Sequence, residues 1–151
     1  MAENKETVFI WPVRVYFEDT DTGGIVFYAN YLKFFERART EWLRHQGIGQ
    51  QVLAQTEELM FVVKNTSIDY HAAARLDDHL EISVRIQKLG RASVQFTQEA
   101  WRINDHDSAR LCTGRIRVGC VNMTSLRPAE IPAEVFRKIS GANESVLTAR
   151  T

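Results

Sequence analysis

The sequence predicts an α+β fold in which one long helix packs against an antiparallel β-sheet. Residues 31–45 repeat their apolar side chains with the 3.6-residue period of a helix. Residues 60–121 instead follow the two-residue period of strands, interrupted by short polar turns. A single helix followed by a run of strands is typical of the α+β class. Alternating βαβ units, which would indicate a parallel α/β sheet, are not predicted.

The first predicted strand lies near the N-terminus. Its apolar residues are Val13, Val15 and Phe17, which alternate with Arg14, Tyr16 and Glu18. We therefore expect the apolar set to face the core. Turn-forming residues at positions 19–24 then end the strand.

The helix predicted over residues 31–45 has a broad apolar face. Its members are Tyr31, Phe34, Phe35, Ala38 and Trp42, extended by Leu32 and Leu43. A face that covers about half of the circumference predicts that a sheet wraps around the helix. Arg39 projects toward the edge of this face, so it needs a partner or a route to solvent. Gly47 is placed to end the helix.

The rest of the chain is rich in strands. After a short helical or irregular stretch at residues 50–55, the predicted strands cover residues 60–74, 80–87, 92–103 and 109–121, the last three as an antiparallel meander. A terminal helix is expected at residues 133–139, and the Ser/Thr-rich end is expected to fray. We expect one domain, with a core at about residues 9–136 and a tail at residues 137–151.

Composition and charge exclude several functional classes. The 151 residues are 44% apolar, and Lys+Arg equals Asp+Glu at 19 each, so the excess positive charge of a nucleic-acid binder is missing. The sequence contains neither an apolar run long enough to span a membrane nor the apolar segment of a signal peptide. Cys112 and Cys120 lie about 26 Å apart along one predicted strand, beyond disulfide reach. These features predict a cytoplasmic protein.

One helix cannot cover both faces of the predicted sheet. The opposite face, or an edge of the sheet, is then expected to pack against another copy of the chain. We therefore predict a homo-oligomer.

Residues 18–24, Glu-Asp-Thr-Asp-Thr-Gly-Gly, lie between the first strand and the long helix and admit four interpretations. Asp19 or Asp21 can simply bond nearby backbone amides in an Asx turn. A calcium loop fits poorly, because Gly23 and Asn30 stand where oxygen-rich ligands are needed. A phosphatase of the haloacid dehalogenase type also carries Asp-x-Asp, but it needs a parallel sheet.

The fourth interpretation is a carboxylate beside the N-terminus of the long helix. Unpaired backbone amides at a helix start can bind an oxyanion, while a neighbouring Asp acts as nucleophile or activates water. Gly23 and Gly24 permit close approach of the backbone and unusual dihedral angles. This arrangement suits acyl transfer, because negative charge develops on a carbonyl oxygen.

Longer runs of sequence make a family resemblance recognisable. Residues 16–31 read Tyr-Phe-Glu-Asp-Thr-Asp-Thr-Gly-Gly-Ile-Val-Phe-Tyr-Ala-Asn-Tyr, and residues 35–39 read Phe-Glu-Arg-Ala-Arg. With residues 74–78, Ala-Arg-Leu-Asp-Asp, they resemble the 4-hydroxybenzoyl-CoA thioesterase family, and within it the Tol-Pal-associated, YbgC-type acyl-CoA thioesterases. The resemblance covers roughly residues 9–136.

The resemblance implies a hotdog fold, dimers that pair into tetramers, and hydrolysis of acyl-CoA thioesters of small or short-chain acids with no metal or organic cofactor. It makes Asp21 the catalytic carboxylate and places the backbone N–H that polarises the thioester carbonyl at Tyr28. Many members of the subgroup have His where this chain has Tyr28. Gly24 is assigned to the substrate-binding loop, and Lys88 and Arg91, at a predicted hairpin, to the phosphates of CoA.

Three alternatives remain at this stage. Lys88 and Arg91 can be a hairpin tip that is charged only for solubility. The domain can be a non-catalytic module that binds acyl-CoA or acyl carrier protein, or, third, the phosphatase named above. No metal site is predicted, because the four histidines lack the spacing of metal ligands.

Overall fold

The computed structural model describes residues 8–150, with side chains described as far as residue 141; residues 1–7 and Thr151 lie outside it. The elements are β1 (Phe9–Arg14), the 3₁₀ helix η1 (Phe17–Asp19), α1 (Asn30–His45), α2 (Gln50–Glu57), β2 (Leu59–Tyr70), β3 (His79–Leu89), β4 (Ser93–Ile103), β5 (Ser108–Asn122) and α3 (Ala133–Arg150). The predicted α+β class is confirmed.

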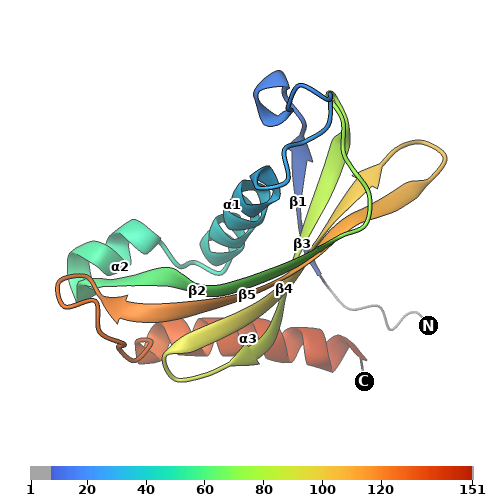
Figure 1. Ribbon diagram of the computed structural model, residues 1–151. Coiled ribbons are helices and arrows are strands. Elements are labelled where there is room, and N and C mark those ends of the chain that lie inside the picture. Colours follow the sequence, from blue (N-terminus) through green and yellow to red (C-terminus); the bar gives the residue numbers. More distant parts are fainter. Residues whose placement is uncertain (1–7, 151) are drawn as a thin grey trace.

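The strands form one sheet in the order β1-β3-β4-β5-β2. Each of the four strand pairings is antiparallel, and β3, β4 and β5 form the predicted meander. The sheet curves strongly, and α1 lies on its concave side (Figure 1). A helix enclosed in this way by an antiparallel sheet is the expected hotdog architecture, and it excludes the parallel sheet of the phosphatase alternative.

The core forms between α1 and the concave face of the sheet. The buried residues of α1 are Tyr31, Phe34, Phe35, Ala38, Trp42 and Leu43, all predicted to face inward. Trp42 meets Phe96 of β4 edge to face, with ring centroids 5.6 Å apart. Phe35 lies over Gly114 of β5, where a Cβ atom would stand 2.6 Å from the ring. Glycine at this position therefore lets the helix approach the sheet closely.

Two residues predicted to be buried are exposed. Leu32 is 42% exposed, because it lies at the side of α1 that the sheet does not reach. Phe17 is 81% exposed, because β1 ends at Arg14 and the chain turns into η1. The buried position after Val15 is taken instead by Asp19.

The C-terminal helix is longer than the sequence predicts. It continues to Arg150 and does not end at Ile139. Ile139 is buried, and Lys138 Nζ donates a hydrogen bond of 3.1 Å to the carbonyl oxygen of Gly47. These contacts hold α3 against the connection between α1 and α2. Within the described residues, no helix is long and apolar enough to cross a membrane.

Candidate active site

The loop between β1 and α1 is tied to the connection between β2 and β3. Val15 N donates to Asp78 O at 3.0 Å, and Val26 N donates to Ala74 O at 2.8 Å. Ile25 also forms an antiparallel bridge with Arg75. The loop is therefore positioned by the connection between β2 and β3 and not by its own residues alone.

Within this loop, the chain folds back on itself as a tight hairpin. Phe27 N donates to Asp19 O at 3.1 Å, and Asp21 N donates to Ile25 O at 2.9 Å. Gly24 closes the turn with a φ of 81°, in the left-handed region that favours glycine. The hairpin carries Asp21 near its tip and leads through Phe27 directly into the start of α1.

Asp19 has a structural role in this hairpin. Its carboxylate oxygen Oδ2 accepts a hydrogen bond of 2.8 Å from Tyr16 N, and its backbone carbonyl accepts one of 2.8 Å from Asn30 Nδ2. Because Asn30 is the first residue of α1, these bonds fix the helix start to the loop. The carboxylate of Asp19 is thus buried and already accepts a hydrogen bond from the backbone.

Asp21, in contrast, is exposed to solvent. Its Oδ1 atom accepts a hydrogen bond of 2.8 Å from Gly23 N, which confirms the Asx-turn interpretation of the local geometry. Within residues 8–141, the Oδ2 atom has no hydrogen-bond or ion-pair partner. The turn therefore fixes the direction of the carboxylate and leaves one oxygen free for chemistry.

The start of α1 is open to an anion. Its N-cap residue, Ala29, provides no side-chain hydrogen bond, and the first turn contains no acidic residue. In the part of the chain that the structure describes, the Tyr28 N–H donates to no protein acceptor. An unpaired amide at the positive end of a helix dipole suits a developing oxyanion.

Aromatic side chains support this helix start, and one of them, Tyr70, was not singled out from the sequence. Tyr70, at the end of β2, donates a hydrogen bond of 2.9 Å from its hydroxyl to Tyr28 O. The Tyr28 and Tyr70 rings meet edge to face at 6.2 Å, and the Tyr31 hydroxyl accepts a bond of 3.1 Å from Ala74 N. Burial raises the pKa of both the Tyr31 and Tyr70 phenols, so both remain neutral at physiological pH. Tyr28 and Tyr70 are 42 residues apart, and no local pattern could have revealed the pair.

The structure does not bring Lys88 and Arg91 to this site within one chain. Both are exposed at the hairpin between β3 and β4, and Arg91 Nη1 lies 3.7 Å from Glu130 Oε2 in an exposed ion pair. His79 lies at the other end of β3, and this end of the strand is the one nearest to the Asp21 loop. Lys88 follows His79 by nine positions of extended strand, a distance of roughly 30 Å.

Metal and thiol chemistry find no support in the described residues. No group of three or more His, Cys, Asp or Glu side chains there could hold a metal ion. Cys112 and Cys120 are buried free thiols. Burial raises the pKa of Cys112 to about 12, which makes it a poor nucleophile.

Comparison with known proteins matches this chain to thioesterases, both by a family model and by individual relatives. A model of the thioesterase superfamily matches residues 23–109. The acyl-CoA thioester hydrolase YbgC of Escherichia coli O6:H1 is 44% identical over 129 residues, covering 85% of this chain and 93% of that protein. The acyl-CoA thioesterase YbgC of Haemophilus influenzae is 43% identical, covering 84% of this chain and 90% of that protein.

Solved structures agree with the fold. A probable thioesterase from Bartonella henselae is 32% identical and superposes with a TM-score of 0.71, covering 83% of this chain and 98% of that chain. A Staphylococcus aureus protein in complex with CoA superposes with a TM-score of 0.84, covering 93% of this chain and 86% of that chain. At 14% identity, this second likeness shows the fold alone.

Proposed function

The chain belongs to the thioesterase superfamily and is a thioester hydrolase, and from this premise we propose that it hydrolyses acyl-CoA thioesters to a free acid and CoA. The observation that carries the site assignment is the hairpin that joins the free Oδ2 atom of Asp21 to the unpaired N–H of Tyr28. One group supplies a carboxylate and the other supplies an oxyanion donor. Acyl transfer needs both.

In the proposed reaction, the thioester carbonyl oxygen accepts a hydrogen bond from the Tyr28 N–H. Asp21 then acts in one of two ways. As a nucleophile, it attacks the carbonyl carbon, the C–S bond breaks, CoA leaves as the thiolate, and water cleaves the resulting anhydride. As a general base, it removes a proton from water, the water oxygen attacks the same carbon, the C–S bond breaks, and CoA leaves as the thiolate, which takes up the proton. The dipole of α1 stabilises the oxyanion in both routes.

We propose a small or short-chain acyl group. Tyr31 and Phe34, the first inward-facing residues of α1, are buried and meet edge to face with ring centroids 5.9 Å apart. They fill the space behind the helix start, so a long chain cannot enter the core there. Gly24 leaves open space at the tip of the hairpin, because nothing lies within 4 Å of the position of a Cβ atom. That space admits the substrate beside Asp21.

We also propose that the active unit is a homo-oligomer, formed as a dimer of dimers. Lys88 lies roughly 30 Å along β3 from the end of the strand nearest to the loop of Asp21, and Arg91 follows in the hairpin beyond it. If they bind the phosphates of CoA, they must act on a substrate held by another copy. We propose acyl carrier protein as a second carrier of the acyl group. The buried free thiols favour a cytoplasmic location.

The variant Asp21→Asn tests the assignment. The asparagine Oδ1 atom can still accept the bond from Gly23 N, so the hairpin is expected to remain folded. We expect kcat to fall by at least about 100-fold, the usual scale for loss of a catalytic acid or base. Asp105→Asn, which removes an exposed carboxylate in the β4–β5 turn, is the matched control.

Release of CoA from short, long and aromatic acyl-CoA thioesters is followed with a thiol-reactive dye. Wild-type turnover by Asp21→Asn would disprove the role of Asp21. Saturable binding of acyl-CoA without thiol release would instead support a non-catalytic module. A single turnover in oxygen-18 water separates the two routes, since label in the Asp21 carboxylate indicates the anhydride.

A further inference from the structure

The turn that carries Tyr28 is held at both ends by one oxygen atom. Phe27 N donates to Asp19 O at 3.1 Å, and Asn30 Nδ2 donates to the same oxygen at 2.8 Å. A carbonyl oxygen has two lone pairs, so these two bonds fill its capacity. Because the acceptor is a carbonyl, the atom of Asn30 that faces it must be the amide nitrogen. The Asn30 side chain therefore ties the first residue of α1 to the hairpin of Asp21.

Asn30 also orients the peptide unit that contains the Tyr28 N–H. This unit consists of the Phe27 carbonyl and the Tyr28 amide. Asn30 N donates to Phe27 O at 2.8 Å, so the carbonyl points toward the start of α1. In a trans peptide the N–H points opposite to the C=O. The Tyr28 N–H therefore points out of the turn, where it meets no acceptor among the described residues.

The Asp19 carbonyl connects this donor to the proposed catalytic carboxylate. Asp19 precedes Asp21 by two residues and is itself firmly held, because its Oδ2 atom accepts a bond of 2.8 Å from Tyr16 N and its own N–H donates to Tyr16 O at 2.9 Å. Asp19 is also buried. The chain leads from this fixed point to Asp21 in one direction, and the side-chain bond of Asn30 leads to the Tyr28 peptide in the other.

We infer that Asn30 is a positioning residue, which holds the Tyr28 N–H at a fixed place relative to the Asp21 carboxylate. The inference rests on the proposed hydrolysis by these two groups. Asn30 acts without touching the substrate, through Asp19 O and Phe27 O. Without its amide, the turn keeps the bond at Phe27 N and loses the bond at its helix end, so the peptide unit can rotate. A misplacement of about 1 Å lowers a rate by about 100-fold.

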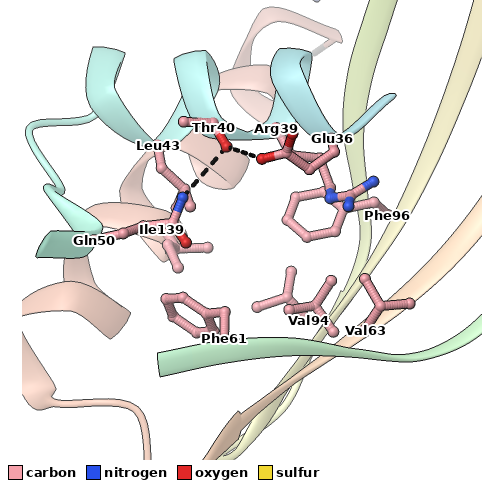
Figure 2. A pocket seen from close by; sticks show the side chains of 11 residues that line it. Glu36, Arg39, Thr40, Leu43, Gln50, Phe61, Val63, Val94, Phe96 and Ile139 are labelled. Carbon is pink, nitrogen blue, oxygen red and sulfur yellow. Dashed lines mark hydrogen bonds between the residues drawn. The ribbon is translucent and has the colours of Figure 1, made fainter. Parts of the chain in front are cut away.

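A substitution of Asn30 does not reshape the main cavity of the fold. That cavity, of about 130 Å³, lies between the second half of α1 and the sheet, and both Glu36 and Arg39 line it (Figure 2). Asn30 does not line it. It precedes Glu36 by six positions, or about 9 Å along the helix axis. A change in turnover caused by Asn30 is therefore not an effect of cavity shape.

The variant Asn30→Ala tests the inference, because it removes the amide and keeps the backbone N–H. Turnover is measured with the most rapidly hydrolysed thioester of the acyl-CoA panel. Binding is measured calorimetrically with the S-alkyl-CoA of the same chain, in which CH₂ replaces the thioester C=O. We expect kcat to fall about 10- to 100-fold. KM and the affinity for the S-alkyl-CoA should stay within about threefold, because the oriented N–H acts chiefly on the oxyanion of the transition state.

Asn122→Ala is the matched control. Asn122 is half-buried like Asn30, and its Oδ1 atom accepts bonds of 2.9 Å from Thr124 N and Ser125 N. It lies at the end of β5 that is far from Tyr70. This variant should also lose side-chain bonds to the backbone and keep the kcat of the wild type. Asn30→Leu, which keeps a neutral branched side chain without a donor, decides the matter if Asn30→Ala does not fold.

Wild-type kcat in a folded Asn30→Ala or Asn30→Leu, or an equal fall in Asn122→Ala, would overturn the inference. A loss of affinity for the S-alkyl-CoA as large as the fall in kcat would overturn it too, because that result indicates general disruption of the site. Asp21→Asn separates the inference from the proposed function. If Asp21→Asn loses turnover and Asn30→Ala keeps it, the positioning role alone is wrong. If Asp21→Asn keeps turnover, both are wrong.

Discussion

Substitution of Gly114 by alanine should destabilise the protein by crowding the core, chiefly against Phe35 and to a smaller extent against Ile116 Cδ1, which would lie 3.2 Å from the new Cβ atom. The new Cβ atom would lie 2.6 Å from Phe35 Cε2 and 3.2 Å from Cδ2. Carbon atoms in contact lie about 3.5–4.0 Å apart, so the ring and the sheet must separate by about 1 Å. Phe35 is fully buried, so its ring cannot move aside into solvent. Either α1 shifts or the Phe35 side chain leaves a favourable rotamer.

The expected magnitude follows from two opposed effects. Overpacking of a core costs about 1–3 kcal/mol. Alanine also restricts the unfolded chain, which stabilises the folded protein by about 0.4–1 kcal/mol. The φ of Gly114 is not positive, so alanine introduces no backbone strain. We therefore expect the free energy of unfolding to fall by about 1–2 kcal/mol.

Urea denaturation followed by circular dichroism measures this change, and the same strand supplies the control. In Gly119→Ala, the new atom meets only the flexible side chain of Lys64, with Cε at 2.8 Å, so we expect a change within about 0.5 kcal/mol. Adding Phe35→Leu to Gly114→Ala should relieve the clash, so the two changes should be less than additive. Equal stability of the two alanine variants would refute the close-approach explanation.

Three further predictions concern the site and the thiols. Tyr70→Phe removes the hydrogen bond to Tyr28 O, so kcat should fall several-fold while stability changes by no more than about 1 kcal/mol. Replacing Lys88 and Arg91 by alanine should raise KM and leave kcat unchanged, because such exposed cations contribute uniform binding; an unchanged KM would favour the solubility interpretation. Cys112 should resist a thiol reagent at pH 8 in the folded chain and react once urea unfolds it. Because its pKa rises from 9.0 to about 12 on folding, the unfolding free energy should fall as the pH is raised from 9.0 toward 12.

Local periodicity predicted the fold well. The inward face of α1 follows from residue spacing alone, because Phe34, Phe35 and Ala38 recur with the helical period. Alternation failed at Phe17 because a 3₁₀ turn, stabilised by the bond from Tyr16 N to Asp19, replaces the last residues of the strand. The hydrogen bond that the Asp19 carboxylate accepts from the backbone determines the local conformation there, although the apolar alternation predicts a strand.

The site was only partly predictable. Asp21 and Gly24 belong to one short turn, so sequence spacing placed them correctly in relation to each other. The partners of Arg39 and Tyr28 lie on distant strands, Gln98 at a separation of 59 residues and Tyr70 at 42. Such contacts depend on how the sheet curves around the helix, which a single sequence does not specify.

The strand order also has a consequence for how the protein folds. The turns that join β3, β4 and β5 are short, so these three strands can pair early at a small entropic cost. Pairing of β1 with β3 joins Arg14 to His79 and must close a loop that contains α1, α2 and β2. We expect this closure to be late and slow. The hairpin of Asp21 lies within that loop, so a nascent chain acquires its sheet before it acquires its activity.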